Sequence, residues 1–268
     1  MEMLVTVEWL TEHLDEVTCI DVRCGVSMPE TRSHGIPGAR TLNIDEEGSD
    51  QSSGLPHTML SPQAFKTLLH QMGIHEGDTI VCYDGYGMFC APRAWWMLRS
   101  AGIAAKVLNG GLPAWESAGH PTAPHQPNPG GGTISVPDAL VGFTDMAGVQ
   151  AALANPDTTV VDARATGRFE GTTPEPREGL TCGHMPGAIN LPFTDLLEDG
   201  YLRPDASEYF ITICGEPHPL VTSCGSGVTA SLLAMVAVGA GYNDVHVYDG
   251  SWAEYGQTGL NLEIVQGT

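Results

Sequence analysis

An internal repeat constrains the fold of this 268-residue chain more than any other feature. The run Val17–Arg23 resembles Thr159–Arg164, because each is a short β-branched segment that ends in an acidic residue and an arginine. The spacing agrees as well, since the intervals 84–109 and 224–249 are equal and each ends just before a glycine. A chain that repeats both order and spacing is expected to hold two copies of one domain.

Strand-like and helix-like patterns alternate within each half of the chain. The clearest helices are predicted over 91–101 and 229–240. This alternation is typical of an α/β fold, here with two tandem domains in which a parallel sheet is flanked by helices. A segment dense in proline and glycine separates the halves, so we predict domains over 1–120 and 138–268, joined by a linker over 121–137.

The chain is strongly acidic, with 32 Asp and Glu against 11 Lys and Arg and a net charge of −21. A surface of this sign repels nucleic acid and anionic membranes, so we expect neither as a partner. The sequence has no run of about 18 apolar residues, which argues against a membrane span. The amino terminus lacks the basic and apolar regions of a signal peptide, and we expect a cytoplasmic protein.

The seven cysteines are scattered and odd in number, and no Cys-x-x-Cys pair occurs. This pattern predicts neither a disulfide framework nor a zinc site, and it favours a reducing compartment. The glycines 130–132 follow no predicted strand, so they do not indicate a nucleotide-binding loop. We therefore expect a protein without a cofactor or a metal.

One cysteine stands in a distinctive setting. Cys224 follows a β-branched run and precedes a glycine-rich turn and an apolar helix. Such a turn aims backbone N–H groups and the positive end of a helix at the sulfur, which favours the nucleophilic thiolate. The alternative is a buried packing thiol. The first half carries Asp84 at the matching position, and an aspartate cannot carry a transferable sulfur, so that half is expected to be catalytically silent.

Several further motifs carry a resemblance to a known family. They are Ala91-Pro-Arg-Ala-Trp-Trp96, Asn109-Gly-Gly-Leu-Pro-Ala-Trp115, Arg168-Phe-Glu-Gly171, Pro174-Glu-Pro-Arg177, Gly183-His-Met-Pro-Gly-Ala188, Cys224-Gly-Ser-Gly-Val-Thr229 and Tyr248-Asp-Gly-Ser-Trp252. With them, nearly the whole chain resembles the tandem-domain sulfurtransferases of the rhodanese superfamily. Members that prefer thiosulfate typically carry Arg-Lys after the cysteine, whereas Gly-Ser, as here, is typical of members that use 3-mercaptopyruvate.

The resemblance implies an enzyme that transfers sulfur by covalent catalysis. The Cys224 thiolate would attack the sulfur of 3-mercaptopyruvate, release pyruvate and become a persulfide. A thiol acceptor, such as thioredoxin or a small thiol, or cyanide in the test tube, would then take the outer sulfur. The loop residues that the resemblance assigns to substrate binding are Gly225, Gly227, Val228 and Thr229.

Two arginines lie in an insertion that the first half lacks. By resemblance, Arg168 and Arg177 bind the carboxylate and the keto oxygen of the substrate, and a guanidinium suits a carboxylate because it can bind it bidentately. The alternative for each is a surface or inter-domain salt bridge, which contributes little to stability.

The resemblance also implies a proton relay. Ser226 would act with a histidine and an aspartate from the first half of the chain, best matched by His57 and Asp45, to deliver a proton to the departing enolate. The alternatives are an exposed loop histidine and a solvated acidic loop. One departure loosens the match, since Leu60 stands where the family usually has a proline.

Three other functions remain open. Thiosulfate could be the main sulfur donor, or the chain could be a non-catalytic persulfide carrier. A cysteine phosphatase of related fold is disfavoured, because Ala230 stands where such enzymes need an arginine to stabilise the phosphoryl charge.

Overall fold

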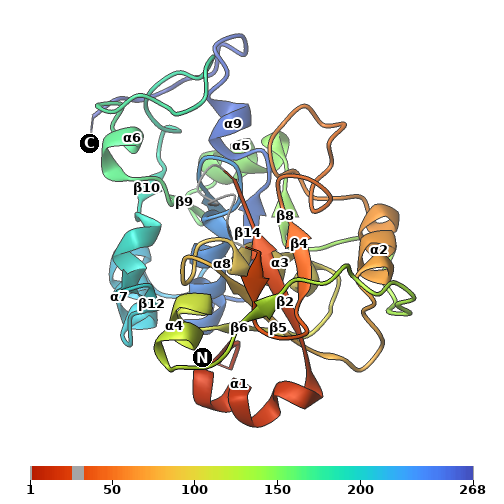
Figure 1. Cartoon of the computed structure of the whole chain (residues 1–268). Helices are drawn as coiled ribbons and strands as arrows, with labels where there is room; N and C mark the ends of the chain where they lie inside the picture. The colour runs from red at the N-terminus through yellow and green to blue at the C-terminus, as the bar shows by residue number, and fades with distance from the viewer. Residues whose placement is uncertain (1, 26–32, 268) are drawn as a thin grey trace. The chain divides into compact units, whose positions relative to one another are not determined.

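The computed structural model describes residues 2–25 and 33–267, drawn in colour in Figure 1. The chain divides into two compact units. Unit 1 comprises Met1–Asp50, Met59–Val141 and Asp199–Leu202, and unit 2 comprises Gln51–Thr58, Gly142–Glu198 and Arg203–Thr268. Each half of the sequence therefore contributes one short segment to the unit that the other half builds.

Unit 1 is built on a five-stranded parallel sheet in the order β1-β6-β5-β2-β4. In that order the strands are Leu4–Val5, Ala105–Leu108, Thr79–Asp84, Val17–Arg23 and Arg40–Asn43. Its helices are α1 (Val7–His13), α2 (Pro62–Gln71), α3 (Ala91–Ser100) and α4 (Gly111–Ser117), with a 3-10 turn η1 at Leu14–Glu16. A short antiparallel pair joins β3 (His34–Gly35) to β7 (Ala123–Pro124).

Unit 2 repeats this plan with a parallel sheet in the order β10-β9-β13-β14-β8. In that order the strands are Ile189–Asn190, Thr159–Asp162, Leu220–Ser223, Val245–Tyr248 and Phe143–Thr144. The helices are α5 (Met146–Ala154), α6 (Thr166–Phe169), α7 (Ala206–Cys214), α8 (Ala230–Gly239) and α9 (Ser251–Tyr255). The remaining elements of unit 2 are η2 (Phe193–Leu196) and β11 (Leu197–Glu198), whereas β12 (Tyr201–Leu202) belongs to unit 1. Two parallel sheets flanked by helices confirm the predicted fold class.

Local sequence signals explain where several helices begin. The side chains of Thr6, Ser61 and Asp145 each accept a backbone N–H from the first turn of α1, α2 and α5. Such caps satisfy donors that the helix cannot satisfy itself, and each contributes about 1 kcal/mol. In α2 the cap is followed directly by Pro62, whose missing N–H is harmless at the first helical position.

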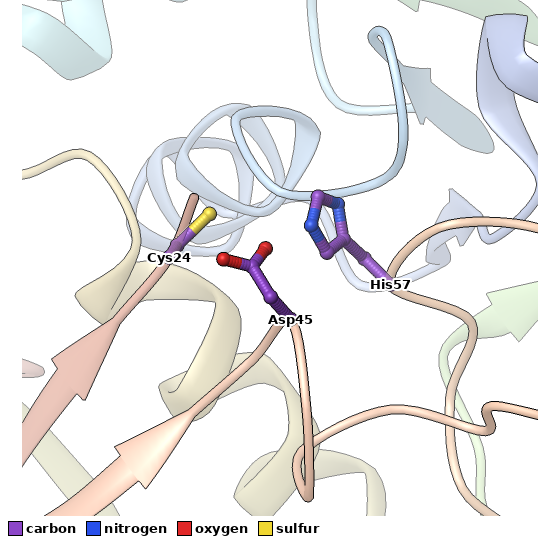
Figure 2. Close-up of side chains that lie close together, drawn as sticks. All are labelled: Cys24, Asp45 and His57. Atoms are coloured by element: carbon purple, nitrogen blue, oxygen red, sulfur yellow. The ribbon is translucent and has the colours of Figure 1, made fainter. Parts of the chain in front are cut away.

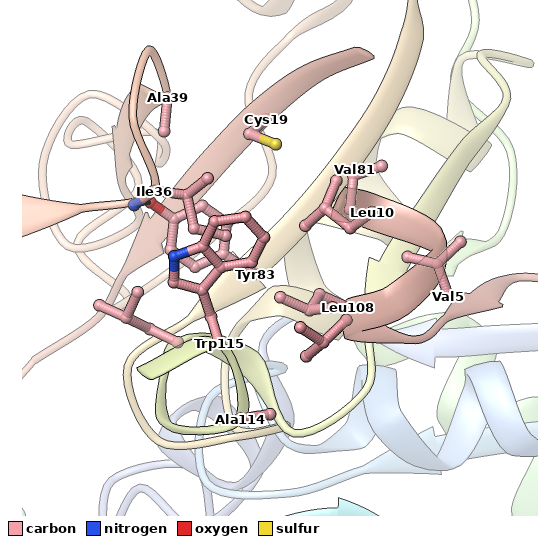
Figure 3. Close-up of a cluster of buried hydrophobic side chains, with 12 residues drawn as sticks. Val5, Leu10, Cys19, Ile36, Ala39, Val81, Tyr83, Leu108, Ala114 and Trp115 are labelled. Carbon is pink, nitrogen blue, oxygen red and sulfur yellow. Dashed lines mark hydrogen bonds between the residues drawn. The ribbon is translucent and has the colours of Figure 1, made fainter. Parts of the chain in front are cut away.

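The core of unit 1 packs one face of its sheet against α1 and α4. Figure 3 shows Trp115 and Tyr83 in this cluster, with Leu10, Val81 and Leu108 around them. These side chains are at most 1% exposed, and burying each contributes about 1.5–3 kcal/mol. In unit 2 the corresponding cluster is centred on Trp252 and Tyr248.

The proline-rich segment after α4 is held along unit 1. The side chain of Asn128 accepts the N–H of Thr41 and donates to its carbonyl, at 3.0 and 2.9 Å. The N–H of Gly132 bonds the carbonyl of His70, and Ile134 is buried. The segment 121–137 is thus tied to unit 1 by specific contacts along its length. No helix within the described residues is long and apolar enough to cross a membrane.

Candidate active site

Cys224 lies at the carboxyl end of a central strand of unit 2. β13 is buried along its whole length between β9 and β14, and Cys224 follows it with 2% of its surface exposed. The carboxyl ends of parallel strands are where open α/β sheets bind ligands. The loop 224–229 then leads into α8, whose amino terminus provides partial positive charge.

The Cys224 loop is anchored to the start of α9. The N–H of Cys224 donates to Ser251 Oγ at 3.3 Å, and its carbonyl accepts the N–H of Trp252 at 3.0 Å. The carbonyl of Gly225 accepts the N–H of Ala253 at 2.9 Å. These contacts leave the turn little freedom, which is the preorganisation that a reacting sulfur requires.

The remaining loop residues complete the turn. Gly227 has φ +78°, a left-handed conformation that favours glycine. Val228 is buried, and the carbonyls of Val228 and Thr229 accept the first N–H groups of α8. Gly225, Gly227, Val228 and Thr229 therefore lie in the turn between β13 and α8, and their contact with a substrate stays a prediction.

His57 and Ser226 are joined by a hydrogen bond of 2.8 Å between Nδ1 and Oγ. Both residues belong to unit 2, because the segment Gln51–Thr58 packs there, and both are buried. His57 also has a left-handed φ of +63°, which is uncommon outside glycine. The alternative of an exposed loop histidine is wrong, and the proton-relay role stays a prediction.

Arg168 and Arg177 converge on the residue after the cysteine. A Cβ placed on Gly225 would lie 3.1 Å from Arg168 Nη2 and 3.7 Å from Arg177 Nη1. Arg177 Nη2 also donates to Ser226 Oγ at 3.5 Å. Two guanidinium groups from the insertion therefore lie beside the residue that follows Cys224, an arrangement that can hold an anion against this loop.

Asp45 belongs to unit 1, and Figure 2 labels it together with Cys24 and His57. β2 and β4 are paired in parallel, so Cys24 and Asp45 come shortly after neighbouring strand ends. The Cys24 Sγ and an Asp45 carboxylate oxygen lie within 4.8 Å of each other. The carboxylate also accepts the N–H of Gly25. A relay from Asp45 to His57 stays a prediction.

A buried charge network beside the site escaped the sequence reasoning. Arg164 is fully buried, pairs with Asp162 at 2.7 Å and stacks over the Trp252 ring at 4.1 Å. Its Nη1 also bonds Glu175, which in turn pairs with Arg168. Burial acts to lower the pKa of Arg164, but the neighbouring carboxylates outweigh it and raise that pKa above its usual value. The sequence signal was the insertion itself, where Glu175 stands between two prolines and close to Arg168 and Arg177.

The matching loop of unit 1 is filled by its own aspartate. The Asp84 carboxylate is fully buried and accepts the N–H groups of Tyr86, Cys90 and Ala91, each at 2.8 Å. An anion is thus held by backbone donors at the place where unit 2 has Cys224. The Asp84 carboxylate occupies this loop, and the expectation that the loop is catalytically silent stays a prediction.

Five of the other six cysteines are buried, and Cys182 is half-buried. All seven are free thiols. Burial raises the pKa of the Cys19 and Cys214 thiols to about 12, so they stay protonated at neutral pH. Within either unit taken alone, the described residues bring no three His, Cys, Asp or Glu side chains close enough together to hold a metal ion.

The fold and the site together define a duplicated α/β protein with a cysteine in the loop of one unit and a buried aspartate in the matching loop of the other. The family model for the rhodanese-like domain matches residues 6–118 and again residues 145–258, and the chain belongs to this family.

The comparisons extend along most of the chain. It is 35% identical to the 3-mercaptopyruvate sulfurtransferase of Escherichia coli (strain K12), over 94% of either chain. It is 38% identical to the thiosulfate sulfurtransferase of Gallus gallus, over 84% of this chain and 80% of that protein. The crystal structure of SseA from Escherichia coli, a 3-mercaptopyruvate sulfotransferase by its description, is similar with a TM-score of 0.81 and 31% identity, covering 94% of this chain and 99% of SseA.

Proposed function

We propose that the chain is a sulfurtransferase that takes sulfur from 3-mercaptopyruvate. The observation that carries the proposal is the convergence of Arg168 and Arg177 on Gly225, directly after Cys224. A donor with a carboxylate near its sulfur fits this arrangement, because the guanidinium groups bind the carboxylate while the thiol reaches Cys224. The likeness to the 3-mercaptopyruvate sulfurtransferase of Escherichia coli supports the same donor.

The reaction proceeds in two steps. The Cys224 thiolate attacks the sulfur of 3-mercaptopyruvate, the carbon–sulfur bond breaks, and its electron pair passes to the carbon as the enolate of pyruvate. The enolate takes up a proton and leaves as pyruvate, while Cys224 holds the sulfur as a persulfide. An acceptor thiol then attacks the outer sulfur, becomes a persulfide itself and restores Cys224. Two-step transfer of this kind gives ping-pong kinetics.

The surrounding residues serve these steps. The backbone N–H groups of the loop and the start of α8 stabilise negative charge on the thiolate and the persulfide. The pair of His57 and Ser226, linked at 2.8 Å, supplies the proton that the enolate needs. Asp45 orients His57 in this proposal. The loop residues Gly225, Gly227, Val228 and Thr229 enclose the donor sulfur.

Thiosulfate is the second candidate donor, because one relative with 38% identity is a thiosulfate sulfurtransferase. A dianion of this kind favours cations inside the loop, whereas this loop carries Gly225 and Ser226. Arg168 already shares its charge with Glu175. We therefore assign thiosulfate a minor activity at most.

The acceptor is a thiol, either a small thiol or a protein thiol such as that of thioredoxin. Seven free cysteines suit a reducing compartment, and we place the enzyme in the cytoplasm. The first domain, over 1–120, has a silent loop at Asp84, and the second, over 138–268, carries the nucleophile Cys224.

The test is steady-state turnover with 3-mercaptopyruvate and with thiosulfate, both with cyanide as acceptor, beside a Cys224→Ser variant. We expect a strong preference for 3-mercaptopyruvate and no turnover by the variant. A preference for thiosulfate would overturn the assignment of the donor. Absence of turnover with either donor would favour a non-catalytic persulfide carrier.

A further inference from the structure

Glu175 is buried between two arginines beside the proposed active site. Its side chain is 2% exposed, although it stands between Pro174 and Pro176 in a loop. Glu175 Oε1 accepts Arg164 Nη1 at 2.9 Å and Arg168 Nε at 3.2 Å. Its Oε2 accepts Arg168 Nη2 at 2.5 Å. One carboxylate therefore binds two guanidinium groups with charge-assisted hydrogen bonds, the strongest kind in proteins.

The pairing fixes which edge of Arg168 faces the Cys224 loop. A guanidinium is a rigid plane, so binding its Nε and Nη2 atoms on one side orients the Nη1 and Nη2 atoms on the other. Glu175 takes the first edge. The second edge faces Gly225, where an added Cβ would lie 3.1 Å from Nη2 and 3.8 Å from Nη1. Within the described part of the chain, no acceptor bonds Arg168 Nη1.

Glu175 is itself held by Arg164, which is fixed by several buried contacts. Arg164 is fully buried, bonds both carboxylate oxygens of Asp162 at the end of β9, and also bonds the carbonyl of Gly183. Arg168, by contrast, is 24% exposed. The chain of contacts thus runs from the sheet through Arg164 and Glu175 to Arg168. Without these contacts the guanidinium of Arg168 would be free to turn towards solvent.

The charges in this network balance except at one residue. Asp162 and Glu175 offset Arg164 and Arg168, whereas within the described residues Arg177 has no carboxylate within ion-pair distance. Arg177 therefore supplies the net positive charge of the site, and Arg168 supplies directed hydrogen bonds. This division of roles depends on Glu175, because without it Arg168 would have no fixed orientation.

We propose that Glu175 is a positioning residue that orients Arg168 to bind the carboxylate of the sulfur donor. Glu175 does not touch the donor, and it acts through the Nη1–Nη2 edge of Arg168. The inference rests on the proposed function in one respect, namely that the donor carries a carboxylate. Replacing Glu175 should weaken donor binding and leave the sulfur-transfer step at Cys224 nearly unchanged.

The first experiment compares Glu175→Gln with Glu178→Gln. Both variants lose one negative charge from the same loop, but Glu178 is exposed and bonds neither Arg164 nor Arg168. For Glu175→Gln we expect the KM for 3-mercaptopyruvate to rise about tenfold or more, with kcat changed less than about threefold, the pattern of lost uniform binding. Glu178→Gln should match the wild type, and Glu175→Asp, which keeps the charge, should recover part of the loss.

A double-mutant cycle separates positioning from a purely structural role. In an Arg168→Ala background, Glu175→Gln should raise KM no further, because the group that it orients is gone. Equal fold-changes from Glu175→Gln with and without Arg168 would overturn the inference. So would a KM for Glu175→Gln that matches that of Glu178→Gln.

A binding measurement keeps this test separate from the test of the reaction. Pyruvate is titrated into the Cys224→Ser protein with and without Glu175→Gln, and its Kd is read by calorimetry. We expect Kd to rise about tenfold or more with Glu175→Gln, whatever the turnover assay gives. If the wild-type protein turns over 3-mercaptopyruvate while Kd and KM are unchanged by Glu175→Gln, the inference fails and the proposed function stands. If turnover is absent but the Kd for pyruvate rises with Glu175→Gln, the proposed function fails and the inference about Glu175 stands.

Discussion

Replacing Arg177 by alanine tests whether the site binds a carboxylate. Arg177 Nη1 would lie 3.7 Å from a Cβ on Gly225, and Nη2 lies 3.5 Å from Ser226 Oγ, so its guanidinium faces the space beside Cys224. Unlike Arg168, it forms no ion pair among the described residues. The Arg177→Ala variant should therefore lose the net positive charge of the site.

The size of the effect follows from this geometry. Two opposite charges about 4 Å apart interact by about 4 kcal/mol at an effective dielectric constant of about 20. Arg177 is partly exposed, so solvent reduces this value towards the 1.5–3 kcal/mol typical of hydrogen bonds to charged groups. At about 1.4 kcal/mol per factor of ten, we expect kcat/KM for 3-mercaptopyruvate to fall about 10- to 150-fold.

The assay compares two donors that differ only in the carboxylate. We would measure kcat/KM with 3-mercaptopyruvate and with 1-mercapto-2-propanone, an uncharged mercaptoketone, using cyanide as acceptor. The loss should appear with the first donor and be less than about threefold with the second. Arg99→Ala, which removes an exposed arginine from unit 1, is the matched control and should leave both values unchanged. An equal loss with both donors would contradict a carboxylate-binding role, since it would mean that Arg177 acts on the loop and not on the carboxylate.

Three further predictions concern stability. Asp84→Ala leaves the buried N–H groups of Cys90 and Ala91 and the part-buried N–H of Tyr86 without an acceptor. At about 1–3 kcal/mol for each buried group, urea unfolding should show a loss of about 2–6 kcal/mol, and a loss under about 1 kcal/mol would contradict the role given to the carboxylate. Burial raises the pKa of the Cys19 and Cys214 thiols from a usual value near 9 to about 12, so their contribution is complete below about pH 9 and is lost as pH rises towards 12. The urea midpoint should fall over this range, and less steeply in Cys19→Ala. A net charge of −21 implies repulsion between the acidic residues of the folded protein. Tm should therefore rise between about 0.1 and 1 M KCl as the screening length shortens, and an unchanged Tm would contradict this repulsion.

The fold was accessible from the sequence because its signals are local and repeated. The β-branched runs, the two clear helices and the matched spacings 84–109 and 224–249 report on strands and helices directly. Cys224 and its glycine turn were recognisable for the same reason, since strand, turn and helix are contiguous in the chain.

The site was only partly accessible, because some of it depends on packing between distant segments. The hydrogen bond between His57 and Ser226 joins residues 169 positions apart, and no periodicity sets that contact. The segment Gln51–Thr58 packs with unit 2, whereas the repeat places it in the first half. The resemblance identified His57 for this reason, and the chemistry of the residues alone did not.

Glu175 shows a second limit. Its burial between Arg164 and Arg168 is set by how an irregular loop folds back on the sheet. An acidic residue in a charged, proline-containing loop is usually solvated, so the sequence gives no reason to expect it buried. The loop conformation alone decides that Glu175 faces inwards.

In the proposed reaction Cys224 receives sulfur and becomes a persulfide. The most direct measurement is the intact mass of the protein after brief treatment with 3-mercaptopyruvate and no acceptor, followed by fragment analysis. We expect a gain of one sulfur atom per chain, located on Cys224, reversed by cyanide and absent in Cys224→Ser. A sulfur gain on another cysteine, or turnover with no gain at Cys224, would contradict it.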